Sequence, residues 1–162
     1  MAYEEYDEES DEQEDYLEKA KEELKRVDHQ VYVTLKYTRT VDVLINVQKR
    51  MISAYEAIIN ALLNLNNETA DFPKSVIEKT NKVLEEYDDP QVRENITIYL
   101  LLRKIVNSKS VIKESEYRRP VKLRTVIDGQ EIMIDIDAVS HFYAVLMSFY
   151  SYVELLYKNK EV

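Results

Sequence analysis

The fold is decided by the stretch VYVTLKYTRTVDVLI, residues 31–45. It is rich in Val, Thr and Tyr, which favour β-strands, and its first residues alternate as those of a half-buried strand would. Yet at about 100° per residue, the rotation of an α-helix, its apolar side chains fall into one sector, and that sector stays in phase as far as Leu63. A strand has no reason to keep this phase, so the stretch is predicted to be helical.

The same helical pattern continues on both sides and predicts helix over residues 12–66, because neither Pro nor Gly occurs before Pro73. An unbroken helix of that length would span about 80 Å, which is too long for one compact domain of this size. Two solutions are open. Either the helix breaks near Asp28–His29 or Thr38–Thr40, where β-branched residues crowd, or its N-terminal arm packs on a second subunit.

Composition sets the class of protein. The chain has 162 residues, of which 45% are hydrophobic, one is Gly and none is Cys. This length suits one domain, and the scarcity of Gly and Pro favours a few long elements. The lack of Cys excludes disulfides and thiolate metal sites. No apolar run approaches the roughly 18 residues of a membrane span, so we expect a cytoplasmic protein without a membrane partner.

The net charge of −9 is concentrated at the N-terminus. The first 15 residues hold nine acids and no base, whereas the rest of the chain holds 22 charges of each sign. Such a run repels itself and buries little surface, so residues 1–11 are predicted to be a disordered acidic tail and residues 12–162 a single helical domain. The tail either solubilises the chain or docks on a basic surface.

The one convincing β element is VKLRTVIDGQEIMIDI, which predicts a hairpin at about residues 120–136. Its Asp128-Gly129 pair is the preferred two-residue turn. The register that follows from this turn puts the apolar side chains on one face and an ion pair on the other. It pairs Leu123 with Ile134, Thr125 with Ile132, and Lys122 with Asp135.

Local signals place the remaining helices. Ser75 starts one helix, Asp89 followed by Pro90 starts the next, and Asp137 is predicted to cap the last. The predicted fold is therefore all-α, a helical bundle of about five helices that carries one β-hairpin.

Residues suited to catalysis are scarce. There is no Cys, no Ser lies in a Gly-flanked elbow, and the single Gly leaves no phosphate-binding loop. His141 follows Asp137 by one helical turn, which would suit a general acid or base, or a metal site with Asp135, but also suits a local hydrogen bond. We assign no catalytic residue, no metal ligand and no cofactor.

A basic segment and a tyrosine strip are the candidate binding features. The segment contains EYRRP, in which an aromatic ring beside two guanidinium groups suits stacking on a base and binding to phosphate. The alternative is a solvated surface whose charges pair with neighbouring acids. The candidate nucleic-acid-binding residues are Arg103, Lys104, Lys113, Tyr117, Arg118, Arg119, Lys122 and Arg124.

The tyrosine strip lies in the last helix, where Tyr143, Tyr150 and Tyr157 recur every seven residues. This spacing puts the three rings on one side of the helix. They are candidates for a partner interface, since Tyr is enriched at interfaces, or for packing at the edge of the core.

A long helical pair, a shorter helix pair and a late helix after an irregular segment resemble the HEPN-like helical bundles. These small prokaryotic domains bind nucleotides or RNA, and some are ribonucleases. Active members carry an Arg, then four to six residues, then a His near the start of a late helix. His141 occupies such a position, but residues 134–137 before it include no Arg. The resemblance therefore implies a binding-type member without the catalytic Arg-His motif. The segment VDHQVYVTLKYTRTVDVLI is also similar to small archaeal proteins of unknown function.

These observations favour a non-enzymatic helical interaction domain that forms a homodimer or binds another protein, because the arm, hairpin and tyrosine strip offer more association surface than a monomer needs. The alternative is an RNA- or nucleotide-binding protein that works through the basic segment. A hydrolase using Asp137 and His141 is the third class.

Overall fold

The computed structural model describes residues 5–66 and 73–160, with side chains from Tyr16 onward. Within these ranges five long helical segments and a small antiparallel sheet confirm the predicted fold class. The first segment is helix α1 (Glu5–His29), a π-helical turn η1 (Gln30–Thr34) and a short helix α2 (Leu35–Tyr37). The others are α3 (Val41–Asn66), α4 (Val76–Glu86), α5 (Pro90–Val106) and α6 (Ile136–Lys160). No helix among the described residues is long and apolar enough to cross a membrane.

The decisive stretch, residues 31–45, ends one helix and begins another. Thr38 takes an extended conformation, and the chain re-enters helix at Val41. Two side chains accept hydrogen bonds from the first turn of α3: Thr40 Oγ1 from the Val43 N–H at 3.2 Å, and the Glu116 carboxylate from the Val41 N–H at 3.0 Å. Of the two places where a break was expected, the structure confirms Thr38–Thr40.

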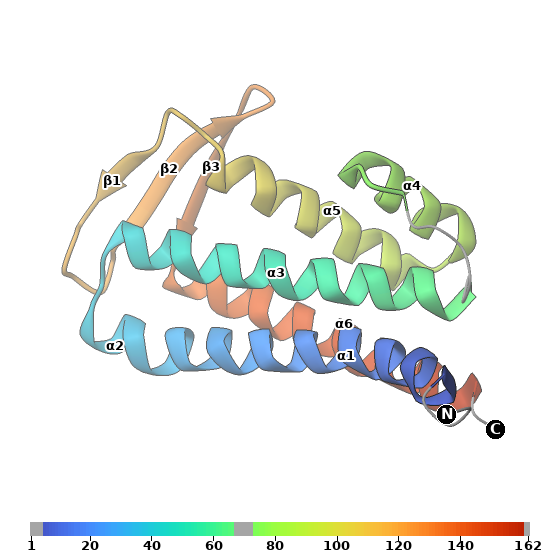
Figure 1. Cartoon of the computed structure of the whole chain (residues 1–162). Coiled ribbons are helices and arrows are strands. Elements are labelled where there is room, and N and C mark those ends of the chain that lie inside the picture. Colours follow the sequence, from blue (N-terminus) through green and yellow to red (C-terminus); the bar gives the residue numbers. More distant parts are fainter. Residues whose placement is uncertain (1–4, 67–72, 161–162) are drawn as a thin grey trace.

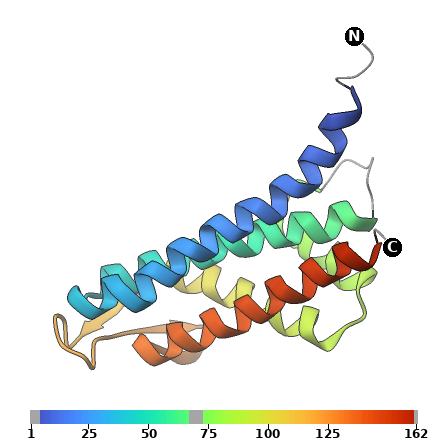
Figure 2. The same cartoon turned by 90° about the horizontal axis from the view of Figure 1, so that it is seen from below.

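The break turns the first helical segment back along the second, so α1 and α3 lie side by side and antiparallel (Figures 1 and 2). The described part of the arm thus packs on its own chain. Helix α3 forms the centre of the bundle, because it contacts α1, α4, α5 and α6 and buries most of its side chains. Of the tail predicted over residues 1–11, residues 1–4 lie outside the described residues, and residues 5–11 are part of α1.

The sheet lies across one end of the bundle (Figure 1) and has the order β1 (Ile112–Glu114), β2 (Lys122–Ile127), β3 (Gln130–Asp135). The predicted register between β2 and β3 is confirmed. Asp128 and Gly129 both have positive φ, 51° and 80°, as the tight hairpin turn requires. The sequence did not predict β1, whose three residues extend the hairpin to a three-stranded sheet.

The inner face of the sheet is buried against α3, α5 and α6, which supplies the support that an isolated hairpin lacks. Strand β3 runs directly into α6, and the Asp135 carboxylate accepts the Ala138 N–H at 2.8 Å. The prediction that Asp137 caps this helix is therefore wrong, because the helix begins at Ile136 and the cap belongs to the last strand residue.

Candidate nucleic-acid interface

Half of the predicted basic segment is neutralised within the chain. Four of its cations each lie 2.6–3.3 Å from a carboxylate oxygen, which matches the alternative of a solvated, internally paired surface. All five ion pairs that these four cations form are solvent-accessible, so each contributes little to stability. The pairs are Arg103 with Glu56, Lys104 with Asp128, Lys113 with Asp42, and Arg124 with both Glu114 and Glu131.

The other half is not paired. Arg118 and Arg119 are exposed and form no ion pair with any described residue, and Lys122, opposite Asp135 in the sheet, is not within ion-pair distance of it. The Tyr117 ring is 79% exposed. The structure therefore separates the predicted residues into a paired group on α5 and the sheet and an unpaired group, which consists of Tyr117, Arg118 and Arg119 in the β1–β2 loop and Lys122 at the start of β2.

This loop is held against the connection between α2 and α3 (Figure 1). The Tyr117 N–H donates to the Arg39 carbonyl at 2.6 Å, one residue after Glu116 accepts from the start of α3. Ser115 and Tyr117 take left-handed φ values of 55° and 65°, which are uncommon for residues other than glycine. One backbone–backbone hydrogen bond, one hydrogen bond from the backbone to the Glu116 carboxylate and a sharply turned loop therefore fix where Tyr117, Arg118 and Arg119 lie.

The contact joins the loop to a second set of aromatic and cationic residues that the sequence did not single out as a site. Tyr37 is 78% exposed, and the Lys36 ammonium lies 6.0 Å from its ring centroid. Arg39 is half-buried, and its Nε has no hydrogen-bond partner among the described residues. We name this surface the corner; it consists of Lys36, Tyr37, Arg39, Tyr117, Arg118 and Arg119.

The corner offers two kinds of contact. Its two exposed rings have faces on which a flat ring can stack, and its four cations have N–H donors that no carboxylate occupies within the described chain. Aromatic stacking combined with cations along a backbone is how proteins bind single-stranded nucleic acid. In the sequence, an aromatic residue beside cations at the predicted helix break is a signal for Lys36, Tyr37 and Arg39, but not for their contact with the β1–β2 loop.

The tyrosine strip of α6 makes intramolecular contacts. Tyr143 is buried and donates to Asp28 at 2.9 Å, Tyr150 donates to Glu154 at 3.3 Å, and the Tyr157 hydroxyl donates to a backbone carbonyl of α3. Burial, followed by the neighbouring carboxylate, raises the pKa of Tyr150 to about 12, and the same causes raise the pKa of Tyr143. These contacts are those of packing at the edge of the core, and a partner interface here stays a prediction.

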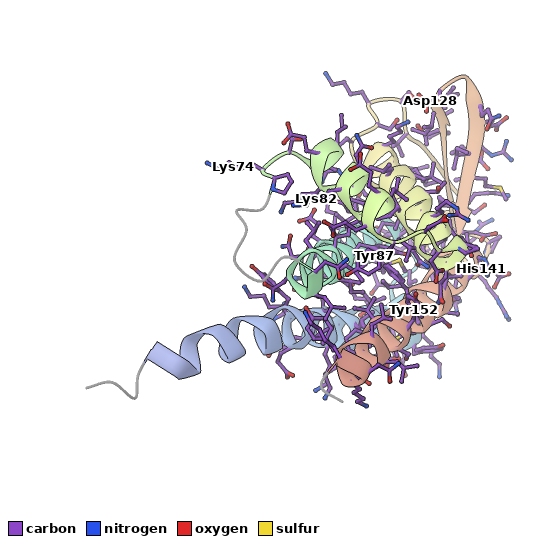
Figure 3. The ribbon with its side chains drawn as sticks, turned by 90° about the vertical axis from the view of Figure 1, so that its right-hand side faces the viewer. Lys74, Lys82, Tyr87, Asp128, His141 and Tyr152 are labelled. Atoms are coloured by element: carbon purple, nitrogen blue, oxygen red, sulfur yellow. The ribbon has the colours of Figure 1, made fainter. Side chains whose placement is uncertain are left out.

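His141 lies on the outer surface of α6 (Figure 3), where its ring is next to that of Phe142 at 6.2 Å between centroids. Asp137 is exposed, and Asp135 caps the helix instead of facing the imidazole. Across residues 16–66 and 73–160, no three His, Asp or Glu side chains gather as a metal site would need. The structure therefore brings the two segments of the corner into contact, whereas it shows no hydrogen bond between Asp137 and His141.

Comparison of the chain with protein-family models, curated proteins and solved structures finds no match, so the geometry of the corner alone carries the functional argument.

Proposed function

We propose that this protein is a non-catalytic domain that binds single-stranded RNA at the corner. The observation that carries the proposal is a pair of tyrosines, 78% and 79% exposed, on two segments joined by the Tyr117–Arg39 hydrogen bond, with four neighbouring cations in those segments that have no carboxylate partner in the described chain. A folded protein gains nothing in stability from such rings, since they bury almost no apolar area. Their exposure is instead suited to stacking on unpaired bases.

Charge limits the proposal to a short footprint. Outside the first 15 residues the chain has equal numbers of acidic and basic side chains, unlike a dedicated nucleic-acid binder with a strongly basic surface. The four cations of the corner outnumber two neighbouring carboxylates, Glu116, which accepts the Val41 N–H, and Asp42, which pairs with Lys113. Binding of a few nucleotides in the cytoplasm, with a strong dependence on salt, fits this distribution.

The lack of an Arg before His141, and the exposed position of that imidazole, favour binding over cleavage. The resemblance to HEPN-like bundles is consistent with an RNA-binding member that has no catalytic Arg-His motif.

Fluorescence anisotropy with a labelled single-stranded oligoribonucleotide tests the proposal. Tyr37→Ala and Tyr117→Ala should each weaken binding by about 1–3 kcal/mol, the cost of one lost stacking platform. Leu155→Ala, which removes a 55% exposed apolar side chain from α6, is the matched control and should bind like the wild type. Unchanged affinity in both tyrosine variants would overturn the proposal.

A homodimer is the second candidate, and the outer face of the sheet favours it. Ile112, Val126 and Met133 are 59%, 57% and 47% exposed and surround Arg124, which is paired in register with two of them. Light scattering coupled to size-exclusion chromatography should then give twice the monomer mass of 19.2 kDa. The Val126→Lys variant should have the mass of a monomer. A wild-type monomer at high concentration would remove this candidate.

A further inference from the structure

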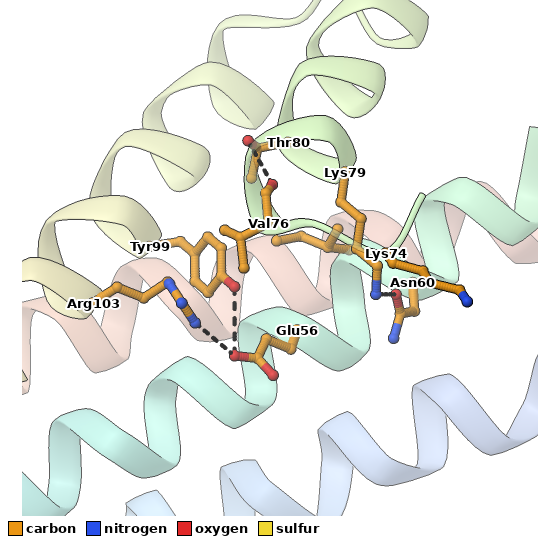
Figure 4. Close-up of a pocket in the computed structure, with 9 residues that line it drawn as sticks. Glu56, Asn60, Lys74, Val76, Lys79, Thr80, Tyr99 and Arg103 are labelled. Carbon is orange, nitrogen blue, oxygen red and sulfur yellow. Dashed lines mark hydrogen bonds and ion pairs between the residues drawn. The ribbon is translucent and has the colours of Figure 1, made fainter. Parts of the chain in front are cut away.

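A polar cavity of about 210 Å³ lies between α3, α4 and α5, away from the corner (Figure 4). Its charged lining consists of Glu56 from α3, Lys74 before α4, Lys79 in α4 and Arg103 in α5. Three cations thus share one cavity with a single carboxylate. A space with this charge excess favours an anion over water or a neutral solute.

Two of the cations are held in place by groups of the cavity wall. The Lys79 ammonium donates to Asn60 Oδ1 at 3.0 Å. The Arg103 guanidinium donates to Glu56 Oε1 at 3.3 Å and lies 5.8 Å from the Tyr99 ring centroid. An ammonium has three N–H donors and a guanidinium has five, so each keeps donors for a ligand.

The acceptors of the cavity are placed beside these donors. Glu56 Oε1 also accepts the Tyr99 hydroxyl at 3.4 Å, and burial, then the charge of Glu56, raises the pKa of Tyr99 to about 12. Tyr99 therefore stays a neutral donor that orients the carboxylate. Among the described residues, Tyr99 and Arg103 both donate to Oε1 of Glu56, which leaves Oε2 as an acceptor for a hydroxyl group of a ligand.

Size and charge together define the ligand class. A volume of about 210 Å³ is below the roughly 300–1,000 Å³ that is usual for the pockets of drug-sized ligands. Three cations against one carboxylate leave two positive charges, which match the dianion of a phosphate ester near neutral pH. We propose that this cavity binds a small phosphomonoester whose short hydroxylated chain donates to Glu56.

Isothermal titration with glycerol 3-phosphate, inorganic phosphate and succinate tests this proposal on the full chain. We expect glycerol 3-phosphate to bind saturably and more tightly than the other two. Lys79→Ala should weaken it by about tenfold, as expected for one lost charged hydrogen bond. Lys82→Ala removes a cation from the same helix outside the cavity (Figure 3) and is the matched control, with unchanged affinity expected.

Lys74→Ala provides a second variant, since this exposed side chain has no described ion pair and its loss should leave the fold intact. The proposal is overturned if glycerol 3-phosphate does not bind, if Lys82→Ala weakens it as much as Lys79→Ala and Lys74→Ala do, or if succinate or free phosphate binds equally well. Arg118→Ala at the corner should leave this titration unchanged, so the outcome is independent of RNA binding.

Discussion

The tyrosines of the bundle and those of the corner differ in burial and in hydrogen bonding. In the bundle, the hydroxyl of each tyrosine of α3, α5 and α6, and that of Tyr87 after α4, donates to an acceptor; Tyr87 and Tyr152 are labelled in Figure 3. At the corner, Tyr37 and Tyr117 are almost fully exposed, and their hydroxyls have no partner in the described chain. A tyrosine whose ring is buried and whose hydroxyl is bonded stabilises the fold. One that has neither is available to a ligand, and the two groups should separate under mutation.

The largest difference is expected in stability. Tyr55 is fully buried and donates to Asn95 at 2.8 Å, so Tyr55→Ala should cost about 3–5 kcal/mol of unfolding free energy. Tyr55→Phe should cost about 1–3 kcal/mol, because it leaves the buried Asn95 oxygen without its donor. Urea denaturation of Tyr117→Ala should instead agree with the wild type within about 0.5 kcal/mol. A large loss at Tyr117 would show that the corner is structural.

The cations should divide in the same way when RNA affinity is measured as a function of salt. The double variant Arg118→Ala/Arg119→Ala should reduce the slope of log affinity against log salt by about 1.4, since each released phosphate contact on a single strand contributes about 0.7. Lys104→Ala/Lys113→Ala removes two cations that already have carboxylate partners and should leave the slope unchanged. Equal changes in the two double variants would remove the distinction between paired and unpaired cations.

The smallest effect concerns a partly exposed pair of the bundle. The Tyr152 hydroxyl donates to Asp89 at 2.7 Å and, with the Gln91 N–H and other contacts, lowers the pKa of that carboxyl. A lowered pKa in the folded state stabilises the protein above the ordinary value of about 3.9, and this contribution is lost as the pH falls through the lowered pKa. Tyr152→Phe should therefore cost up to about 1 kcal/mol at pH 7 and much less near pH 2. A cost that does not change with pH would contradict the assigned cause.

Sequence patterns predicted those features of the fold that depend on contacts between residues close together in the chain. The caps at Ser75 and Asp89 accept from N–H groups two or three residues away, and the hairpin register follows from its own turn. Strand β1 was missed because three residues are too few to show alternation. The cap of α6 was misplaced because Asp135 and Asp137 are equally good candidates by composition, and only the end of β3 decides between them.

The corner could not be predicted, because it depends on contacts between segments far apart in the chain. The Tyr117 N–H meets the Arg39 carbonyl only after the α1–α3 pair and the sheet have packed together. The division of the basic segment has the same origin, since Lys113 finds Asp42 across 71 residues. Sequence reasoning identified Tyr117, Arg118 and Arg119 as candidates but not the Lys36–Arg39 half of the surface.

The π-helical turn Gln30–Thr34 determines the direction in which Lys36 and Tyr37 leave the helix. A π turn takes up about one residue more than an α turn, and one residue corresponds to about 100° of rotation around the helix axis. Removing a residue from this turn would keep the helix but rotate Lys36 and Tyr37 away from the β1–β2 loop, or Leu35 out of the core. The π turn therefore changes the rotation of the side chains that follow it around the helix axis. Because of this change, one helical segment buries its apolar stripe along α3 and still presents Lys36 and Tyr37 to solvent at its C-terminal end.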